Sequence, residues 1–144
     1  MAPVNELAVN KTKYDANASG SNTIPAGEGN SSVHCSYDYY TTAVDIEATS
    51  TISLCNLPKG AKIRGVEVTH SALGTGVTLA LGDALDADRY FGATASATAG
   101  TIRDMLQTGV NYQIGTTATD DVPILTVGTA SANGTIEVVF FYSF

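Results

Sequence analysis

Tryptophan is missing from this chain of 144 residues, and cysteine and histidine occur only twice each. Cys35 and Cys55 are too few for a disulfide framework, and their spacing of twenty residues matches no metal-binding motif. No stretch approaches the roughly 18 apolar residues of a membrane span. Residues 1–13 lack the apolar core and cleavage site of a signal peptide. The sequence therefore predicts a soluble protein that is made in a cytoplasm.

Basic residues are also scarce: seven Lys and Arg stand against fourteen Asp and Glu, which gives a formal net charge of −7. Phosphate backbones and anionic membranes both attract clustered basic residues, so we expect neither a nucleic-acid nor a membrane partner. Only 15% of the residues are charged, against a usual share of about a quarter. Surfaces poor in Lys and Glu are common at contacts with other protein chains, although any Thr/Ser-rich β-protein has a similar composition.

The first 32 residues differ from the rest of the chain. Between Asn17 and Ser32 the single large apolar residue is Ile24, so this stretch cannot bury enough apolar surface to offset its ordering entropy. It is either disordered in isolation or ordered on a neighbouring chain. A short apolar set would provide the contacts: Val4, Leu7, Val9, Tyr14 and Ile24. We therefore expect an extended N-terminal arm at residues 1–32 and a β-domain at residues 33–144.

From residue 33 the sequence is typical of β-structure. Residues 44–54 alternate between apolar and polar side chains, which predicts a strand with one buried face; a bend at residues 49–51 would split it in two. Leu57-Pro58-Lys59-Gly60 predicts a turn. The apolar phase then flips at Gly65, which suggests a β-bulge. Residues 76–81 form another alternating segment.

The second half of the chain is harder to interpret. Residues 101–107 fit either one helical turn or a strand at the edge of a sheet, and Tyr112 and Ile114 resume a strand. Residues 122–127 predict a strand, which Pro123 would place at an edge. Asn-Gly at residues 133–134 predicts a hairpin that joins this strand to the last one, at residues 135–144.

The last strand is apolar on both faces at its centre, since Val139 and Phe141 face away from Ile136, Val138 and Phe140. A strand of this kind must be covered on both sides, and exposure would invite aggregation. Val139 and Phe141 therefore need a partner chain or the N-terminal arm. Seven or eight short strands with frequent turns predict an all-β fold, a single β-sandwich of jelly-roll type.

Candidate chemistry is sparse. His34 and Cys35 are neighbours on an expected strand, so their side chains point apart and cannot form a catalytic pair; His70 with either cysteine stays open. Three carboxylates could hold a hard cation such as Ca²⁺, namely Asp83, Asp86 and Asp88, but their spacing fits no EF-hand. The alternative is a hydrogen-bonded loop in which Asp86 or Asp88 pairs with Arg89. We expect no catalytic residues and no cofactor.

A glycosidase would need two carboxylates across a groove, and the available Asp and Glu residues do not forbid one. The nearest substitute for an aromatic sugar platform is Tyr37, Tyr39 and Tyr40, which alternate on an expected strand. We interpret these tyrosines as packing or interface residues.

Three segments carry a resemblance: LPKGAKIRGVEV at residues 57–68, TLALGD at residues 78–83 and DADRY at residues 86–90. Together with the hydrophobic last strand, they resemble the head decoration (cement) proteins of tailed bacteriophages, small β-sandwich proteins on the capsid exterior. The resemblance covers about residues 55–92 and the last strand, and says little about residues 1–32 or 94–120.

The resemblance implies a non-enzymatic virion protein, located at the capsid surface, whose partners are the major capsid protein and further copies of itself, as a trimer. An acidic sandwich with a pliable arm and a two-faced apolar strand agrees with this role. The alternative is a β-sandwich module of a tail or fibre that binds a carbohydrate or a receptor.

Overall fold

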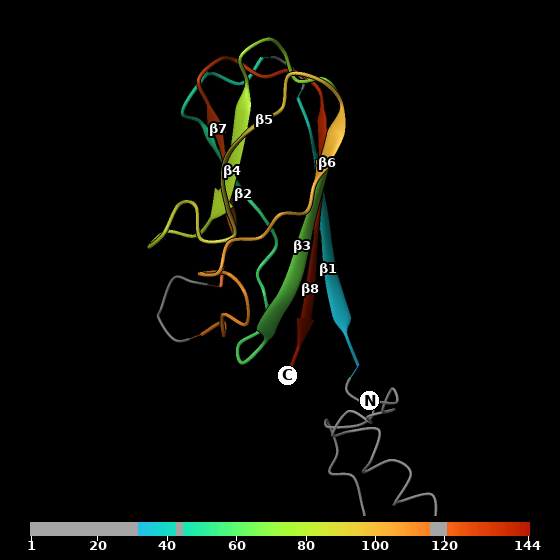
Figure 1. Ribbon diagram of the computed structural model, residues 1–144, viewed down its shortest axis with the longest axis vertical. Coiled ribbons are helices and arrows are strands. Elements are labelled where there is room, and N and C mark those ends of the chain that lie inside the picture. Colours follow the sequence, from blue (N-terminus) through green and yellow to red (C-terminus); the bar gives the residue numbers. More distant parts are fainter. Residues whose placement is uncertain (1–31, 43–44, 116–120) are drawn as a thin grey trace, which may run out of the picture. The chain divides into compact units, whose positions relative to one another are not determined.

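The computed structural model describes residues 32–42, 45–115 and 121–144, and Figure 1 shows its eight β-strands. The strands are β1 (His34–Thr41), β2 (Thr51–Ser53), β3 (Lys62–His70), β4 (Thr78–Gly82), β5 (Phe91–Ala95), β6 (Gly100–Ile102), β7 (Ile124–Gly128) and β8 (Thr135–Ser143). All the regular elements of the described residues are strands, which confirms the all-β prediction. No helix in this part of the chain is long and apolar enough to cross a membrane.

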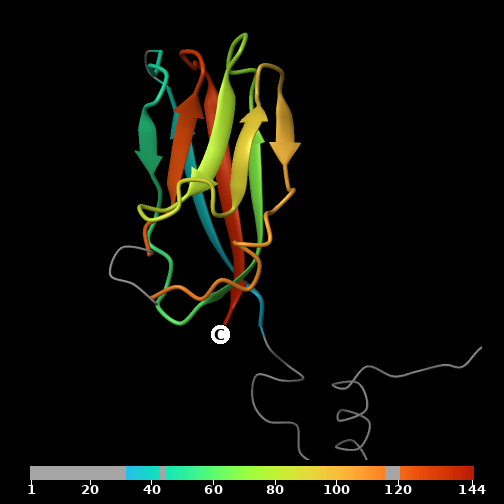
Figure 2. The ribbon, with the colours of Figure 1, turned by 60° about the vertical axis from the view of Figure 1, so that its left-hand side comes forward.

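The strands form two four-stranded antiparallel sheets. The first has the order β1-β8-β3-β6 and the second the order β2-β7-β4-β5. Figure 1 shows the two sheets as separate layers, and Figure 2 looks onto the second sheet with its four strands side by side. The prediction of a single β-sandwich is therefore confirmed.

The core lies between the two sheets, because alternate residues of each strand point inward. The first sheet contributes Ile63, Val68 and Ile136, and the second contributes Leu79 and Leu125, all at most 1% exposed. The ring of Tyr90 packs edge-on against Phe140, with ring centroids 5.1 Å apart. The inward face of β8 was predicted correctly from its even-numbered apolar positions.

Several local predictions are confirmed. Gly60 lies in the turn before β3 with φ of 85°, a conformation that glycine adopts without strain. The register between β3 and β8 shifts between Ile63 and Gly65, as expected for a bulge. The 44–54 segment is bent rather than a single strand: Thr49 has φ of 71° and only β2 remains regular, while Val44 lies outside the described residues.

Other local predictions are wrong. Strand β7 is central, between β2 and β4, and not at an edge; Pro123 just precedes it, so its missing amide costs no ladder hydrogen bond. The segment at residues 132–134 is no hairpin, because β7 and β8 belong to different sheets. Tyr112 and Ile114 form no strand: Gln113 makes only an isolated bridge to Lys62.

Candidate interaction surface

The outer face of the first sheet brings together side chains from three strands. Across β1 and β8, Cys35 is opposite Phe141, Tyr37 is opposite Val139, and Tyr39 is opposite Glu137. Directly opposed residues of an antiparallel pair point to the same side of the sheet. Strand β3 continues these rows, with Gly65 opposite Phe141 and Glu67 opposite Val139. We call this set the outer face: Cys35, Tyr37, Tyr39, Gly65, Glu67, Glu137, Val139 and Phe141.

The centre of the outer face is apolar and accessible. Tyr37 is 54% exposed, Tyr39 66% and Phe141 38%, while Val139 is half-buried. The two tyrosine rings stack with centroids 6.3 Å apart and planes at 28°. The Phe141 ring lies over Gly65, where a Cβ atom would be 3.6 Å from Cδ2. Grouped exposed apolar side chains make this face a candidate interaction surface.

Charged residues flank this apolar centre. The Arg103 guanidinium donates a hydrogen bond to Glu67 Oε2 at 2.7 Å, and this contact lowers the pKa of Glu67. Desolvation and then the Glu137 carboxylate raise the pKa of Tyr37. An aromatic centre with polar residues around it has the composition of a protein–protein interface.

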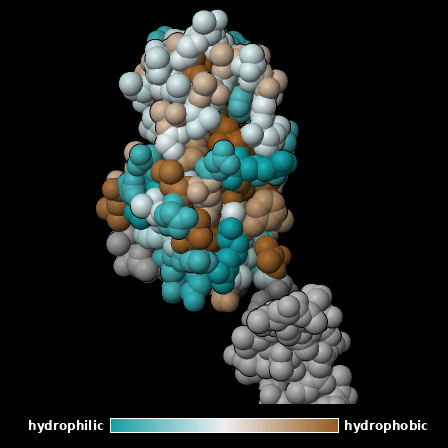
Figure 3. All heavy atoms as spheres, in the orientation of Figure 1, coloured by the Kyte–Doolittle hydropathy of each residue, from teal (hydrophilic) through white to brown (hydrophobic). Residues whose placement is uncertain are grey.

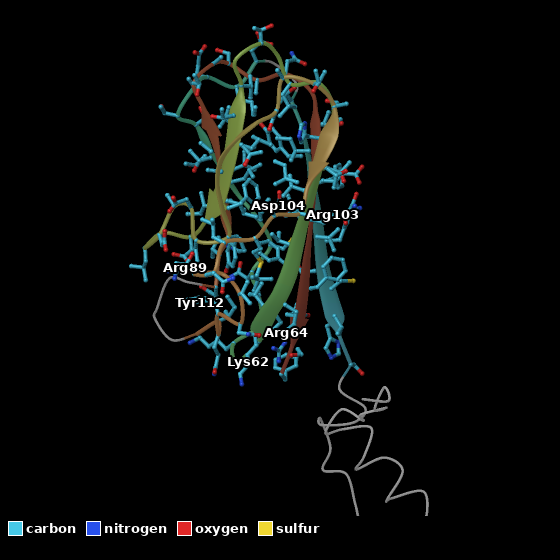
Figure 4. All side chains as sticks on the ribbon, viewed as in Figure 1. Lys62, Arg64, Arg89, Arg103, Asp104 and Tyr112 are labelled. Carbon is cyan, nitrogen blue, oxygen red and sulfur yellow. The ribbon has the colours of Figure 1, made fainter. Side chains whose placement is uncertain are left out.

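Basic side chains lie where β3 begins and β8 ends. Lys62 is opposite Ser143, and the Arg64 guanidinium donates hydrogen bonds to Ser143 Oγ, at 2.8 Å, and to Asn111 Oδ1. Figure 4 shows Lys62 and Arg64 at the lower end of the sandwich. In Figure 3 the upper end of the visible face is mostly of intermediate hydropathy, whereas the strongest hydrophilic and hydrophobic residues lie mainly at its middle and lower end.

The Asp83–Asp88 loop is held by an ion pair. Asp83 is buried and accepts hydrogen bonds from the amides of Leu85 and Asp86, at 2.9 and 3.0 Å, and from the Arg89 guanidinium. The Arg89 guanidinium also stacks on the Tyr112 ring, with Cζ 4.0 Å from its centroid. Hydrogen bonding to Asp83 raises the pKa of Arg89. The Asp83 carboxylate, which a bound metal cation would need as a ligand, is thus already paired with Arg89.

The expected pairing of Arg89 with Asp86 is present, at 3.8 Å, but the main partner of Arg89 is Asp83. The exposed Asp88 forms no ion pair within the described residues. Within the ranges that the structure describes, no three His, Cys, Asp or Glu side chains are grouped as metal ligands would be.

The histidines and cysteines differ in their surroundings. His70 is buried, and its Nδ1 is 2.8 Å from the carbonyl oxygen of Ser71, while the exposed His34 stacks on Tyr142. Cys35 and Cys55 are both exposed free thiols. Hydrogen bonding to Asp38 is the main cause of a raised pKa at Cys55, which is the opposite of what activates a nucleophilic thiol.

The structure bears differently on the predicted interface residues. It places Val139 and Phe141 together on the outer face, and adds Tyr37 and Tyr39 to them. Tyr40 instead packs against the core from the other side of β1. Period-two alternation along β1 could have separated Tyr40 from the other tyrosines, but only the β1–β8 register places them beside Val139. The remaining predicted residues lie outside the described ranges: Val4, Leu7, Val9, Tyr14 and Ile24.

Fold and surface together define a β-sandwich with one accessible aromatic sheet face. No protein-family model matches the sequence, and no curated protein matches it. Among solved structures, the chain is similar to a chain of the "Cyanophage Pam1 capsid asymmetric unit", with a TM-score of 0.67, 25% sequence identity, and coverage of 85% of this chain and 91% of that one.

It is also similar to a chain of the "Capsid of Ralstonia phage GP4", with a TM-score of 0.61 and 20% identity over 78% of this chain and 84% of that one. The second likeness is one of fold alone. Both matched chains come from structures of phage capsids.

Proposed function

We propose that this protein is a structural component of a bacteriophage virion, which binds the exterior of the capsid and stabilises it as a decoration (cement) protein. The observation that carries this proposal is the similarity over 85% of the chain to a chain from a cyanophage capsid. We propose that it acts without catalysis, at the capsid surface, and that its partners are the major capsid protein and further copies of itself.

Strand order supports the jelly-roll form of the sandwich. Strand β1 pairs with β8, β2 with β7, β3 with β6 and β4 with β5. This nested pairing is what results when a long hairpin of four strand pairs wraps into two sheets, as in the jelly rolls that are common in viral capsids.

The contact surfaces are the outer face and the N-terminal segment. Val139 and Phe141, with Tyr37 and Tyr39, offer an apolar area that a neighbouring chain would bury. Residues 1–32 supply a second set of apolar anchors, namely Val4, Leu7, Val9, Tyr14 and Ile24. We propose a trimer as the oligomeric state.

Binding to shells assembled without this protein tests the proposal. The purified chain is expected to cosediment with such shells, and deletion of residues 1–20 is expected to abolish binding while the sandwich stays folded. Unchanged binding of the deletion variant would refute the role of the arm. Light scattering is expected to give a trimer at micromolar concentration; a monomer that also fails to bind shells would overturn the decoration role.

A second candidate is a tail or fibre module that binds a carbohydrate or a receptor. The stacked and exposed rings of Tyr37 and Tyr39 favour it, because sugar rings pack on exposed aromatic faces. A glycan array probed with and without Ca²⁺ tests this candidate, and a uniformly negative array would leave it unsupported.

A further inference from the structure

Cationic side chains without a carboxylate partner gather at one end of the sandwich. The described part of the chain contains five Lys and Arg residues: Lys59, Lys62, Arg64, Arg89 and Arg103. Arg89 pairs with Asp83, and Arg103 pairs with Glu67. Within the described ranges, the other three form no salt bridge within 4.0 Å. We call Lys59, Lys62 and Arg64 the basic end.

The fold holds these three side chains close to the start of β3. Lys62 and Arg64 are two residues apart and exposed, and Lys59 lies in the preceding turn. Lys59 packs against Gly115, where a Cβ atom would be 3.0 Å from Cγ. The Arg64 guanidinium is fixed by Ser143 and Asn111, so little further rotamer entropy is lost when it binds a carboxylate.

The Asp121 carboxylate lies near the basic end but does not pair with it. Asp121 is close to the same turn, because its carbonyl oxygen accepts the Leu57 amide at 2.7 Å. Its carboxylate accepts a hydrogen bond from Asn56 Nδ2 at 3.0 Å and forms no salt bridge with the three cations. Within the part of the chain that the structure describes, the basic end thus carries three cations without a carboxylate partner, on a chain with a net charge of −7.

Three strand ends lie at the basic end. Strand β1 begins at the end of the sandwich where β3 begins and β8 ends, since His34 is opposite Tyr142 and Lys62 is opposite Ser143. Figure 1 shows these strand ends together at the lower end of the molecule. The start of β1 therefore lies at the same end of the sandwich as the basic end.

We propose that the basic end is the surface that faces the capsid and that it binds an acidic patch of the shell protein. This inference rests on the proposed function. An acidic protein such as this one is repelled by an acidic surface unless its few free cations face that surface. A protein partner fits better than a nucleic acid, since phosphate binding needs more basic groups than three on a chain of this charge.

Complementary charges of this kind act chiefly on the association rate and on salt dependence, because the screening length is about 8 Å at physiological ionic strength. The experiment is therefore a salt titration of binding to shells assembled without this chain. The test variant is Lys59→Gln with Lys62→Gln, and the matched control is Thr75→Glu with Thr98→Glu. Both lower the net charge by two, but Thr75 and Thr98 are exposed residues of the turns that follow β3 and β5, away from the start of β3 and from the outer face.

We expect the double variant to bind at least tenfold more weakly than the wild type at low salt, with a shallower salt dependence, and the control to bind within twofold of the wild type. Arg64→Gln is expected to add to the loss. Thermal unfolding at the wild-type temperature verifies that each variant is folded.

Four outcomes would overturn the inference. Wild-type protein that binds shells while the double variant binds equally well would refute the basic end and leave the decoration role intact. Equal losses of shell binding in the double variant and in the control would show that net charge alone, and not the basic end, determines binding. Binding of the wild type to a short DNA duplex, lost in the double variant, would make the partner a nucleic acid. A wild type that never binds shells would overturn the proposed function together with this inference.

Discussion

The Asp38 carboxylate accepts a hydrogen bond from the backbone amide of Cys55 at 2.9 Å, across 17 residues of sequence. The same carboxylate accepts the Tyr39 amide at 2.8 Å. Strand β1 is an edge of the first sheet and β2 is an edge of the second, and Cys55 follows β2 by two residues. The Asp38 side chain thus links an edge of one sheet to an edge of the other. Unpaired amides at such edges can form hydrogen bonds with strands of other chains.

Replacing Asp38 is expected to alter the thiol of Cys55. Hydrogen bonding to Asp38, then its charge, raises the pKa of this thiol from its ordinary 9.0. In a Cys35→Ser background, Asp38→Asn should therefore lower the pKa and speed alkylation of Cys55 by iodoacetamide at pH 8. The control is Ser36→Asn in the same background, because Ser36 is two residues from Asp38 and on the same side of β1. Equal alkylation rates in the Cys35→Ser protein and in both of its variants would contradict the contact.

The same contact has a consequence for stability. Because the pKa of Cys55 is raised in the fold, the folded state holds the thiol proton more tightly than the unfolded state. The contribution is present below pH 9.0 and is lost as the pH rises through the folded-state value. Urea unfolding from pH 8 to pH 10.5 is expected to show a steeper decline for the wild type than for Cys55→Ser; identical slopes would contradict this.

The pair of Asp83 and Arg89 is expected to be the ion pair on which stability depends most. The Asp83 side chain is fully buried, and that of Arg89 is 13% exposed. Asp83→Ala leaves a buried guanidinium and two loop amides without their acceptor, so it should lower the free energy of unfolding by about 3 kcal/mol. Asp88→Ala, in the same loop but exposed, should change it by less than about 0.5 kcal/mol.

Equilibrium urea denaturation measures both variants. A comparable loss in the two would show that the loop depends on its overall charge. A rise in the wild-type unfolding temperature on addition of millimolar Ca²⁺ would favour the metal site that the three aspartates first suggested, because a ligand that binds only the folded state stabilises it.

Gly82 is expected to tolerate no side chain. A Cβ atom there would be 2.0 Å from the Asp86 carbonyl oxygen and 2.4 Å from the Ala87 carbonyl carbon, and these backbone atoms cannot move aside. Gly82→Ala should cost at least about 2 kcal/mol of unfolding free energy. Gly92→Ala, whose Cβ atom would approach nothing closer than 3.9 Å, is the control. Similar unfolding midpoints for the two variants would refute the close approach.

The outer face is expected to matter for association rather than for folding. Tyr37→Ser with Tyr39→Ser removes two exposed rings from β1 and should shift the unfolding free energy by less than about 1 kcal/mol. It should weaken binding to shells, or self-association, by at least tenfold, since aromatic residues dominate interface energetics. The control is Thr41→Ser at the end of the same strand. Association of the double variant at the wild-type level would show that the outer face is not part of the interface.

Sequence patterns within a few residues correctly predicted those features that local steric and side-chain effects determine. The bulge at Gly65 follows from the apolar phase change, and the turn at Gly60 follows from the need for positive φ. The inward face of β8 follows from alternation alone. Each of these depends on side-chain periodicity or backbone sterics, which a single sequence carries.

Predictions that needed strand pairing failed or stayed incomplete. Asn133-Gly134 has the composition of a tight hairpin, but the Asn133 amide instead donates to the Leu73 carbonyl oxygen at 3.0 Å, as the chain crosses between sheets. Arg89 pairs with Asp86 as expected, but its main partner is Asp83, six residues back, which the sequence pattern did not identify. Tyr37 and Val139 are 102 residues apart, and only the β1–β8 register brings them together.

The decoration role itself is tested most directly by counting copies in the virion. Quantitative mass spectrometry of purified virions of the phage that encodes this chain would give its molar ratio to the major capsid protein. We predict a fixed ratio typical of a protein that repeats over the whole capsid surface. Absence from virions, or only the few copies per particle of a tail or fibre component, would contradict it.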